Sequence, residues 1–139
     1  MRNLLLVALL GLAGAVHAQR THASRQAGFD VTIADSTYHM KQYWFVLYTK
    51  GDGPVLDSLT AATLQKEHLA HQDAQAAKGL IVMAGPYGKN DEGWRGLLLY
   101  DCDTREEVET QLMQDPFVKV GRLKYTIAPW WGAVGTKLP

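Results

Sequence analysis

The chain has 139 residues and 47% hydrophobic content, which is enough for one domain with an ordinary core and does not require a second. Its 14 basic and 14 acidic residues give a formal net charge of zero, and long blocks of like charge are absent. No basic stripe is interleaved with aromatic residues, so the composition argues against a nucleic-acid partner.

Residues 1–18 are predicted to be a cleavable signal peptide. One basic residue, Arg2, precedes an apolar run over 4–16, and Val16-His17-Ala18 forms a small-x-small cleavage site. A transmembrane helix is the less favoured alternative, because the run is shorter than the roughly 20 apolar residues needed to span a bilayer. We therefore expect a periplasmic or secreted protein that has no membrane partner after cleavage.

Residues 19–40 are predicted to form an N-terminal extension with at most one short turn of helix, because they are polar and show no sustained period. The first strand is predicted over 43–50, which is rich in aromatic and branched residues. Gly51-Asp52-Gly53-Pro54 follows it as a turn.

The central helix is predicted to begin at Ser58 or Thr60, whose hydroxyl groups suit an N-cap, and to end at Lys78 before Gly79. Five apolar residues over 80–84 then predict a buried strand. The helical period places the side chain of a histidine, His68, on the inward face of this helix.

The second half of the chain predicts another strand, a helix and a final strand. A turn-rich loop covers 85–93 and leads into these elements. They are a strand over 94–100, a helix over 103–114, a helical turn from Asp115-Pro116 to Val120, and a strand over 122–131.

The order β-α-β-β-α-β is the ferredoxin-like split βαβ pattern, which predicts an α+β fold with one antiparallel sheet and both helices on one face. The other face would be a large apolar patch on a monomer, so we expect a homodimer that associates through the sheets. Its lining is expected to include some of Trp44, Tyr48, Trp94, Tyr100, Tyr125, Trp130 and Trp131.

Three segments, 66–91, 94–101 and 114–134, resemble the YciI-like (YCII-related) family of dimeric α/β-barrel proteins. The likeness extends from about Met40 to Val134. The matching features are His68, Gly85-Pro86, Asp115-Pro116 and the closing aromatic region Tyr125–Trp131.

This resemblance implies a domain over 41–135 whose ferredoxin-like sheet pairs with that of a second copy to form a dimeric α/β barrel. It also implies a small cleft in each protomer, where the histidine and the aspartate lie near one another. Related dimeric barrels include lactone isomerases, dehalogenating enzymes and cofactor-free oxygenases that act on small cyclic or aromatic compounds. We expect a small organic ligand and no cofactor.

His68 and Asp115 are the candidate catalytic residues. A histidine has both protonation states available near neutral pH, and a neighbouring carboxylate selects its tautomer and orientation. The alternative is purely structural: Asp115 caps the helical turn after Pro116, and His68 is a core histidine that is satisfied by a backbone carbonyl.

Gly85, Pro86 and Arg95 are the candidate substrate-binding residues. The first two are turn residues that can also shape the rim of a cleft, and Arg95 either pairs with an acidic substrate or is an interface or surface charge. A metal site is not predicted. His71 lies three residues from His68, but the sequence supplies no Cys/His cluster for a third ligand.

Two functions from different classes follow. In the first, the protein is an enzyme in which His68, oriented by Asp115, moves a proton on a small organic molecule, as in isomerase, lyase or dehalogenase chemistry. In the second, the same fold is a non-catalytic module that binds a small ligand or serves assembly.

We expect protein isolated from the periplasm of a Gram-negative host to lack residues 1–18, because the apolar run ends in a signal-peptidase site. Intact-mass measurement tests this directly. A periplasmic product that still begins at Met1 would instead favour a membrane anchor.

Overall fold

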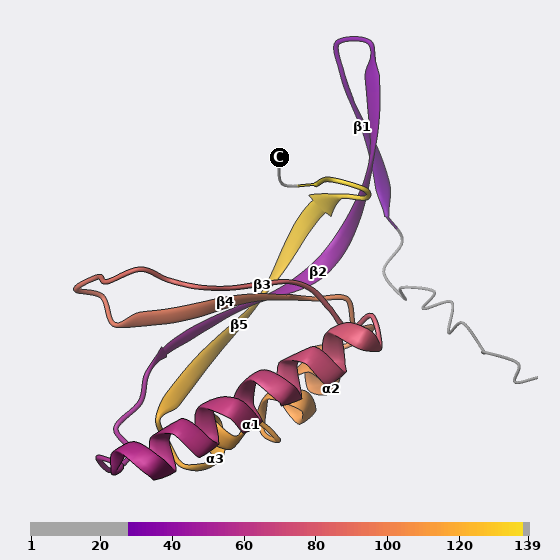
Figure 1. Ribbon diagram of the computed structural model, residues 1–139. Helices are drawn as coiled ribbons and strands as arrows, with labels where there is room; N and C mark the ends of the chain where they lie inside the picture. The colour runs from indigo at the N-terminus through magenta and orange to yellow at the C-terminus, as the bar shows by residue number, and fades with distance from the viewer. Residues whose placement is uncertain (1–27, 138–139) are drawn as a thin grey trace, which may run out of the picture.

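The computed structural model describes residues 28–137. This part of the chain forms one five-stranded sheet, and the helices all lie on the same face of it (Figure 1). The predicted signal peptide, 1–18, and the first part of the predicted extension, 19–27, lie outside the described residues. Within residues 28–137, no helix has the length and apolar character needed to cross a membrane.

The order of elements confirms the predicted α+β fold. The bounds are β1 Phe29–Ile33, β2 Ser36–Lys50, α1 Ser58–Ala77, β3 Ile81–Pro86, β4 Trp94–Tyr100, α2 Arg105–Leu112, α3 Pro116–Lys119 and β5 Leu123–Ala133. From β2 to β5 the chain follows the β-α-β-β-α-β pattern, with strands in the spatial order β5-β2-β4-β3 and every neighbouring pair antiparallel. This arrangement is the ferredoxin-like split βαβ unit.

The prediction of an irregular extension is wrong for residues 29–40. β1 and the beginning of β2 form an antiparallel hairpin whose register runs from Phe29↔Met40 to Ile33↔Ser36. In Figure 1 this hairpin projects beyond the rest of the sheet. The sequence of β1 does alternate, with Phe29, Val31 and Ile33 apolar and the two residues between them polar, but the run is only five residues long and most of its side chains are exposed.

The N-cap of α1 also differs from the prediction, because Asp57 provides it instead of Ser58 or Thr60. The Asp57 side chain accepts a hydrogen bond from the Thr60 amide at 2.9 Å and another from the Thr60 hydroxyl at 2.6 Å. The two oxygens of a carboxylate can accept from both groups at once, so Asp57 caps the helix one residue before the predicted Ser58. Gly79 follows the helix with φ 74°, as expected for a residue just past a helix end.

The core lies between the sheet and the helices. Its fully buried side chains include Val46 and Leu98 from the sheet and Val108 and Leu112 from α2. Because side chains alternate along a strand, the burial of Val46 also places Trp44 and Tyr48 on the helix-facing side of β2.

Several aromatic residues predicted for the uncovered face therefore lie on the covered one. Trp44, Tyr48, Tyr100 and Tyr125 belong to the hydrophobic core or pack against it. The prediction is correct for Trp130, which is 45% exposed. The error arises because aromatic content alone does not tell which face of a strand a residue occupies.

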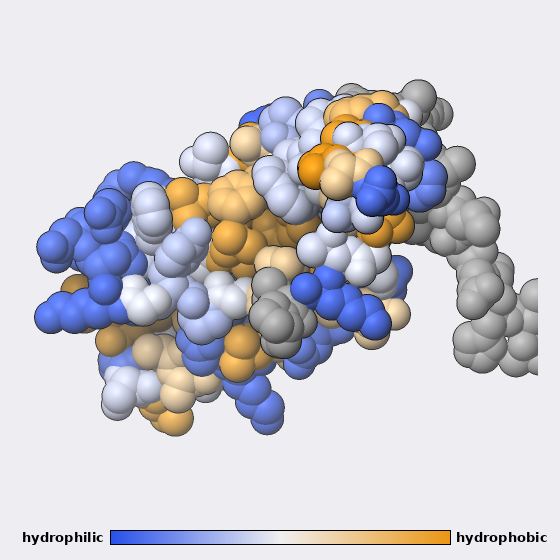
Figure 2. Space-filling view, turned by 90° about the horizontal axis from the view of Figure 1, so that it is seen from above, coloured by the Kyte–Doolittle hydropathy of each residue, from blue (hydrophilic) through white to orange (hydrophobic). Residues whose placement is uncertain are grey.

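The face of the sheet that the helices leave uncovered is mostly apolar, and we refer to it as the open sheet face. The strand register assigns to it Tyr43, Phe45, Leu47, Met83, Leu97, Leu99, Ala128 and Trp130. In Figure 2, hydrophobic residues gather near the centre of this side of the molecule, with hydrophilic residues around them. The ring centroids of Tyr43 and Trp130 lie 6.1 Å apart across two strands of this face.

Candidate functional site

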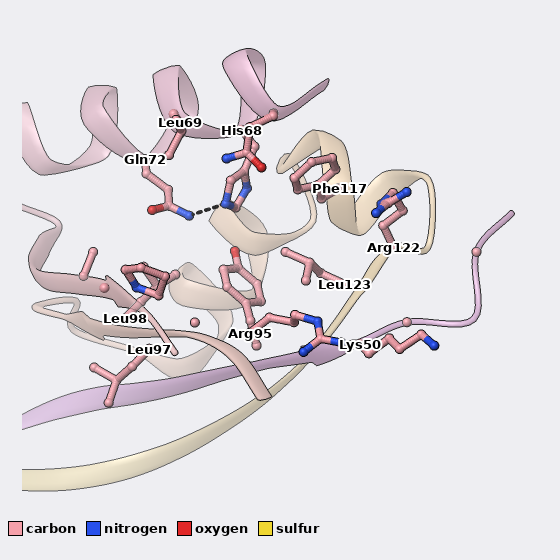
Figure 3. Close-up of a pocket in the computed structure, with 18 of the residues that line it drawn as sticks. Lys50, His68, Leu69, Gln72, Arg95, Leu97, Leu98, Phe117, Arg122 and Leu123 are labelled. Atoms are coloured by element: carbon pink, nitrogen blue, oxygen red, sulfur yellow. Dashed lines mark hydrogen bonds between the residues drawn. The ribbon is translucent and has the colours of Figure 1, made fainter. Parts of the chain in front are cut away.

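A cavity of about 760 Å³ lies between α1 and the helix-facing side of the sheet. It is lined by residues from β2 and the loop after it, from α1, β3, β4 and α3, and from the turn that leads into β5. Its basic and amide-bearing lining residues are Lys50, Gln65, His68, Gln72, Arg95 and Arg122. Figure 3 shows His68 and Gln72 reaching toward the cavity from α1, with Arg95 and Lys50 on the opposite side of it. A cavity of this size suits a small organic molecule.

His68 lies on the buried face of α1, as the helical period predicted, and only 8% of its surface is exposed. Its ring packs near two aromatic rings, Phe117 at 5.0 Å and Tyr48 at 6.0 Å between centroids. These rings restrict the imidazole to one orientation, in which one nitrogen faces the interior and the other faces Gln72.

Asp115 is completely buried, and its carboxylate accepts hydrogen bonds from three different elements. His68 Nδ1 lies 2.7 Å from Oδ2 and 2.9 Å from Oδ1. The Tyr48 hydroxyl donates to Oδ2 at 2.9 Å, and the amide of Phe117 donates to Oδ1 at 2.9 Å. Asp115 therefore caps α3, as predicted, and contacts His68 with the same side chain.

The pKa of Asp115 lies below its usual value. Burial by itself raises this pKa, but the hydrogen bond and charge of His68 lower it, and the Phe117 amide and the Tyr48 hydroxyl add to the lowering. The carboxylate is thus ionised at neutral pH, although no water reaches it.

The partners of His68 determine its tautomer. An ionised carboxylate can only accept, so Nδ1 carries a proton and donates it to Asp115. On the other side, the amide nitrogen of Gln72 lies 2.8 Å from His68 Nε2, and an amide nitrogen can only donate. In this arrangement Nδ1 donates and Nε2 accepts, and the lone pair of Nε2 points toward Gln72, which lines the cavity.

Tyr48 is a site residue that sequence reasoning missed. Burial, together with the negative charge of Asp115, raises the pKa of the Tyr48 phenol, so it remains neutral and continues to donate to Asp115. The alternation of side chains along β2 could have indicated that Tyr48 points inward, because Tyr48 occupies the same face as the buried Val46.

The predicted substrate-binding residues Gly85, Pro86 and Arg95 all line the cavity. Their roles in binding stay predictions. Gly85 and Pro86 line it, but they are the last residues of β3 and not part of a loop as expected. Arg95 also lines it. The register between β2 and β4 shifts here, since Tyr48 pairs with Gly96 and Thr49 pairs with Trp94, so Arg95 is the extra residue of a β-bulge.

His71 makes a structural hydrogen bond and is not placed as a metal ligand. Its Nε2 lies 3.0 Å from the backbone carbonyl of Gln111, to which it donates, so it connects α1 to the end of α2. Among residues 28–137, no three His, Cys, Asp or Glu side chains are grouped so that they could hold a metal ion.

Comparisons with known proteins find one family and a small number of distant structures. A family model described as YCII-related domain matches residues 43–131. No curated protein matches the chain at a significant level.

Two solved structures resemble the chain at low identity. One is 5-chloro-2-hydroxyhydroquinone dehydrochlorinase (TftG) from Burkholderia phenoliruptrix in complex with 2,5-dihydroxybenzoquinone, with 24% identity and a TM-score of 0.45 over 63% of this chain and 92% of that chain. The other is a dimeric protein of unknown function and ferredoxin-like fold from Bacteroides fragilis, with 14% identity and a TM-score of 0.43 over 66% of this chain and 94% of that chain.

The lowered pKa of Asp115 predicts a specific dependence of stability on pH. A carboxylate whose pKa is lower in the folded than in the unfolded state stabilises the fold above its unfolded pKa of about 4, and this contribution is lost as the pH falls through the folded pKa. We expect Asp115→Asn to reduce the free energy of unfolding at neutral pH by about 1 to 3 kcal/mol, because an amide cannot accept from all three donors.

Urea unfolding from pH 7 downward measures both effects. The free energy of unfolding of Asp115→Asn should fall less steeply with acidification than that of the wild type. Asp91→Asn, the same change in the exposed loop between β3 and β4, corrects for the loss of one charge. Equal slopes for wild type and Asp115→Asn would show that the carboxylate is not stabilised by these contacts.

Proposed function

The chain belongs to the YCII-related family, and we propose that it is an exported small enzyme in which His68 transfers a proton on a small organic substrate. The observation that carries this proposal is the His68 ring itself. Its Nδ1–H is fixed by a buried carboxylate 2.7 Å away, while its Nε2 lone pair faces Gln72 at the cavity wall. Such a pairing orients a histidine as a general base and stabilises the imidazolium that forms when it takes a proton.

In the proposed reaction, the substrate displaces the Gln72 amide from Nε2 and places an acidic C–H or O–H group there. Nε2 takes the proton, and Asp115 offsets the new positive charge through Nδ1–H. Tyr48 and the Phe117 amide keep the carboxylate in place during this step, because both donate to it throughout.

Two overall reactions are compatible with this step. In an isomerisation, His68 returns the proton to a different atom of the substrate. In an elimination, the electron pair of the broken C–H bond forms a double bond, and a leaving group departs with the electron pair of its own bond. Neither needs an electron acceptor, so this chemistry requires no redox cofactor.

We expect His68→Asn to lower turnover by about 10²-fold to 10⁴-fold, which is the usual contribution of a general base. Asparagine can still donate to Asp115 from near the Nδ1 position, but it has no basic nitrogen at the position of Nε2. The assay is ¹H NMR in D₂O with a panel of small cyclic ketones, lactones and halogenated phenols, in which proton abstraction appears as deuterium incorporation or loss of halide.

Thermal melting of His68→Asn checks that the fold is retained, and Gln65→Asn provides a control at another lining residue of α1. Wild-type turnover that persists in His68→Asn would overturn the assignment of the base. Binding of panel compounds without any exchange would support the alternative, a non-catalytic ligand-binding module.

We also propose that the protein is a homodimer that associates through the open sheet face. Met83 and Trp130 are 38% and 45% exposed on a face where most neighbours are apolar. A contiguous apolar surface of this kind is unusual on a monomer. A second copy covers it most simply, because a two-fold axis pairs the same patch from each subunit.

A pair of methionine variants tests the dimer by size-exclusion chromatography with light scattering. We expect Met83→Glu, on the open sheet face, to raise the dimer dissociation constant by at least about 10-fold, because a carboxylate would be buried without a partner. Met113→Glu makes the same change at the exposed end of α2 and should have no effect. A wild-type monomer at micromolar concentration would contradict the proposal.

A further inference from the structure

The cavity wall is strongly asymmetric in charge. It includes Lys50, Arg95 and Arg122, and none of the residues that line it within the described part of the chain is an aspartate or a glutamate. Figure 3 shows Arg95 and Lys50 across the cavity from His68, and Arg122 beside Phe117. The wall therefore presents positive charge to whatever occupies the cavity.

None of these cations is neutralised by an ion pair among residues 28–137. The side-chain hydrogen bond of Arg95 goes to the backbone carbonyl of Trp94 at 3.0 Å, and the Arg122 guanidinium lies over the Phe117 ring at 5.6 Å. The nearby carboxylate of Asp52 pairs with Lys124, which is the main cause of its lowered pKa, and Lys50 contributes least to that lowering. The donors of the cavity are thus available to a ligand.

The β-bulge in β4 gives Arg95 its position. Arg95 is the extra residue between the pairs Tyr48↔Gly96 and Thr49↔Trp94, so the simple alternation of the strand does not determine its direction. Bulges commonly redirect a side chain next to a functional site. The neighbouring Gly96 has no side chain, which leaves space beside Tyr48 on the same stretch of the wall.

The remaining wall is apolar and close to the base. Leu69, Leu98 and Leu123 line it, and Phe117 contacts both the His68 ring, at 5.0 Å, and the Arg122 guanidinium. A single aromatic side chain therefore separates the candidate base from a cation. If a small molecule bound to these cations through an anionic group, its apolar body would lie within reach of His68.

We propose that the substrates of this site are small organic carboxylates with a ring-sized apolar body. The carboxylate binds to Arg95 and Arg122, with Lys50 adding positive charge, and the apolar body lies against the leucines and Phe117. Guanidinium groups suit this function because their planar array of donors matches a carboxylate. This inference rests on the proposed function for the reaction at His68, but the binding it predicts does not depend on catalysis.

Two pairs of probes of matched shape test the inference: benzoate against benzamide, and cyclohexanecarboxylate against cyclohexanecarboxamide. NMR chemical-shift titration of the wild-type protein should show that each acid binds at least about 10-fold more tightly than its amide, because a hydrogen bond to a charged group is stronger than one to a neutral group. Added salt should weaken the binding of the acids and leave that of the amides almost unchanged.

Charge-removing variants locate the binding groups. Arg95→Gln and Arg122→Gln should each weaken the binding of benzoate by about 10-fold to 100-fold without changing that of benzamide. Lys89→Gln removes the same charge from the exposed β3–β4 loop, away from the cavity, and should have no effect. His68→Asn should still bind benzoate, which separates this proposal from the proposed acid–base reaction.

Three results would overturn the inference. Equal affinity for acids and amides would show that the cations do not select the ligand. An equal loss of affinity in Lys89→Gln would attribute binding to net charge instead of to the cavity. The absence of any acid binding at millimolar concentration would exclude this substrate class, whereas exchange of neutral compounds by the same protein would leave the role of His68 intact.

Discussion

The hydrogen bonds around the Asp115 carboxylate are the interaction on which the site depends. One buried group accepts from the ring of His68 on α1, the hydroxyl of Tyr48 on β2 and the first amide of α3. A charge removed from water is tolerated only when such donors surround it. The buried carboxylate therefore requires its three donors, and the donors are held in place by their bonds to it. The three elements that it connects are also walls of the cavity. The stability of this region and the orientation of His68, the proposed base, therefore have a common physical origin.

This network shows that the structural and the catalytic interpretations of the histidine and aspartate are compatible. Asp115 caps a helix, and His68 is buried and satisfied, as a structural role requires. The same bonds leave Nε2 as the nitrogen on the cavity side, with Gln72 as its only side-chain hydrogen-bond partner among the described residues. A histidine that served packing alone would not need its second nitrogen at a wall with room for a small molecule.

Local patterns predicted much of the fold and the main pair of the site. The bounds of β4 match the prediction, and the inward direction of His68 and the capping role of Asp115 both follow from helical rules that depend on near neighbours. The features that were missed depend on pairing between distant segments. The short apolar-polar alternation of β1 becomes a strand only through its pairing with β2, and the contact of Tyr48 with Asp115 joins residues far apart in the sequence.

The position of Arg95 is the clearest case of information that a single strand does not contain. Alternation along β4 is interrupted by one extra residue, and only the register against β2 reveals the interruption. The same strand then serves two surfaces, because Gly96 and Leu98 lie toward the cavity while Leu99 belongs to the open sheet face. A partner that covered the open sheet face would restrict the motion of β4. The part of the cavity wall that carries Arg95 would then become more rigid as well. The proposed assembly and the proposed substrate binding would thus act on opposite faces of the same strand.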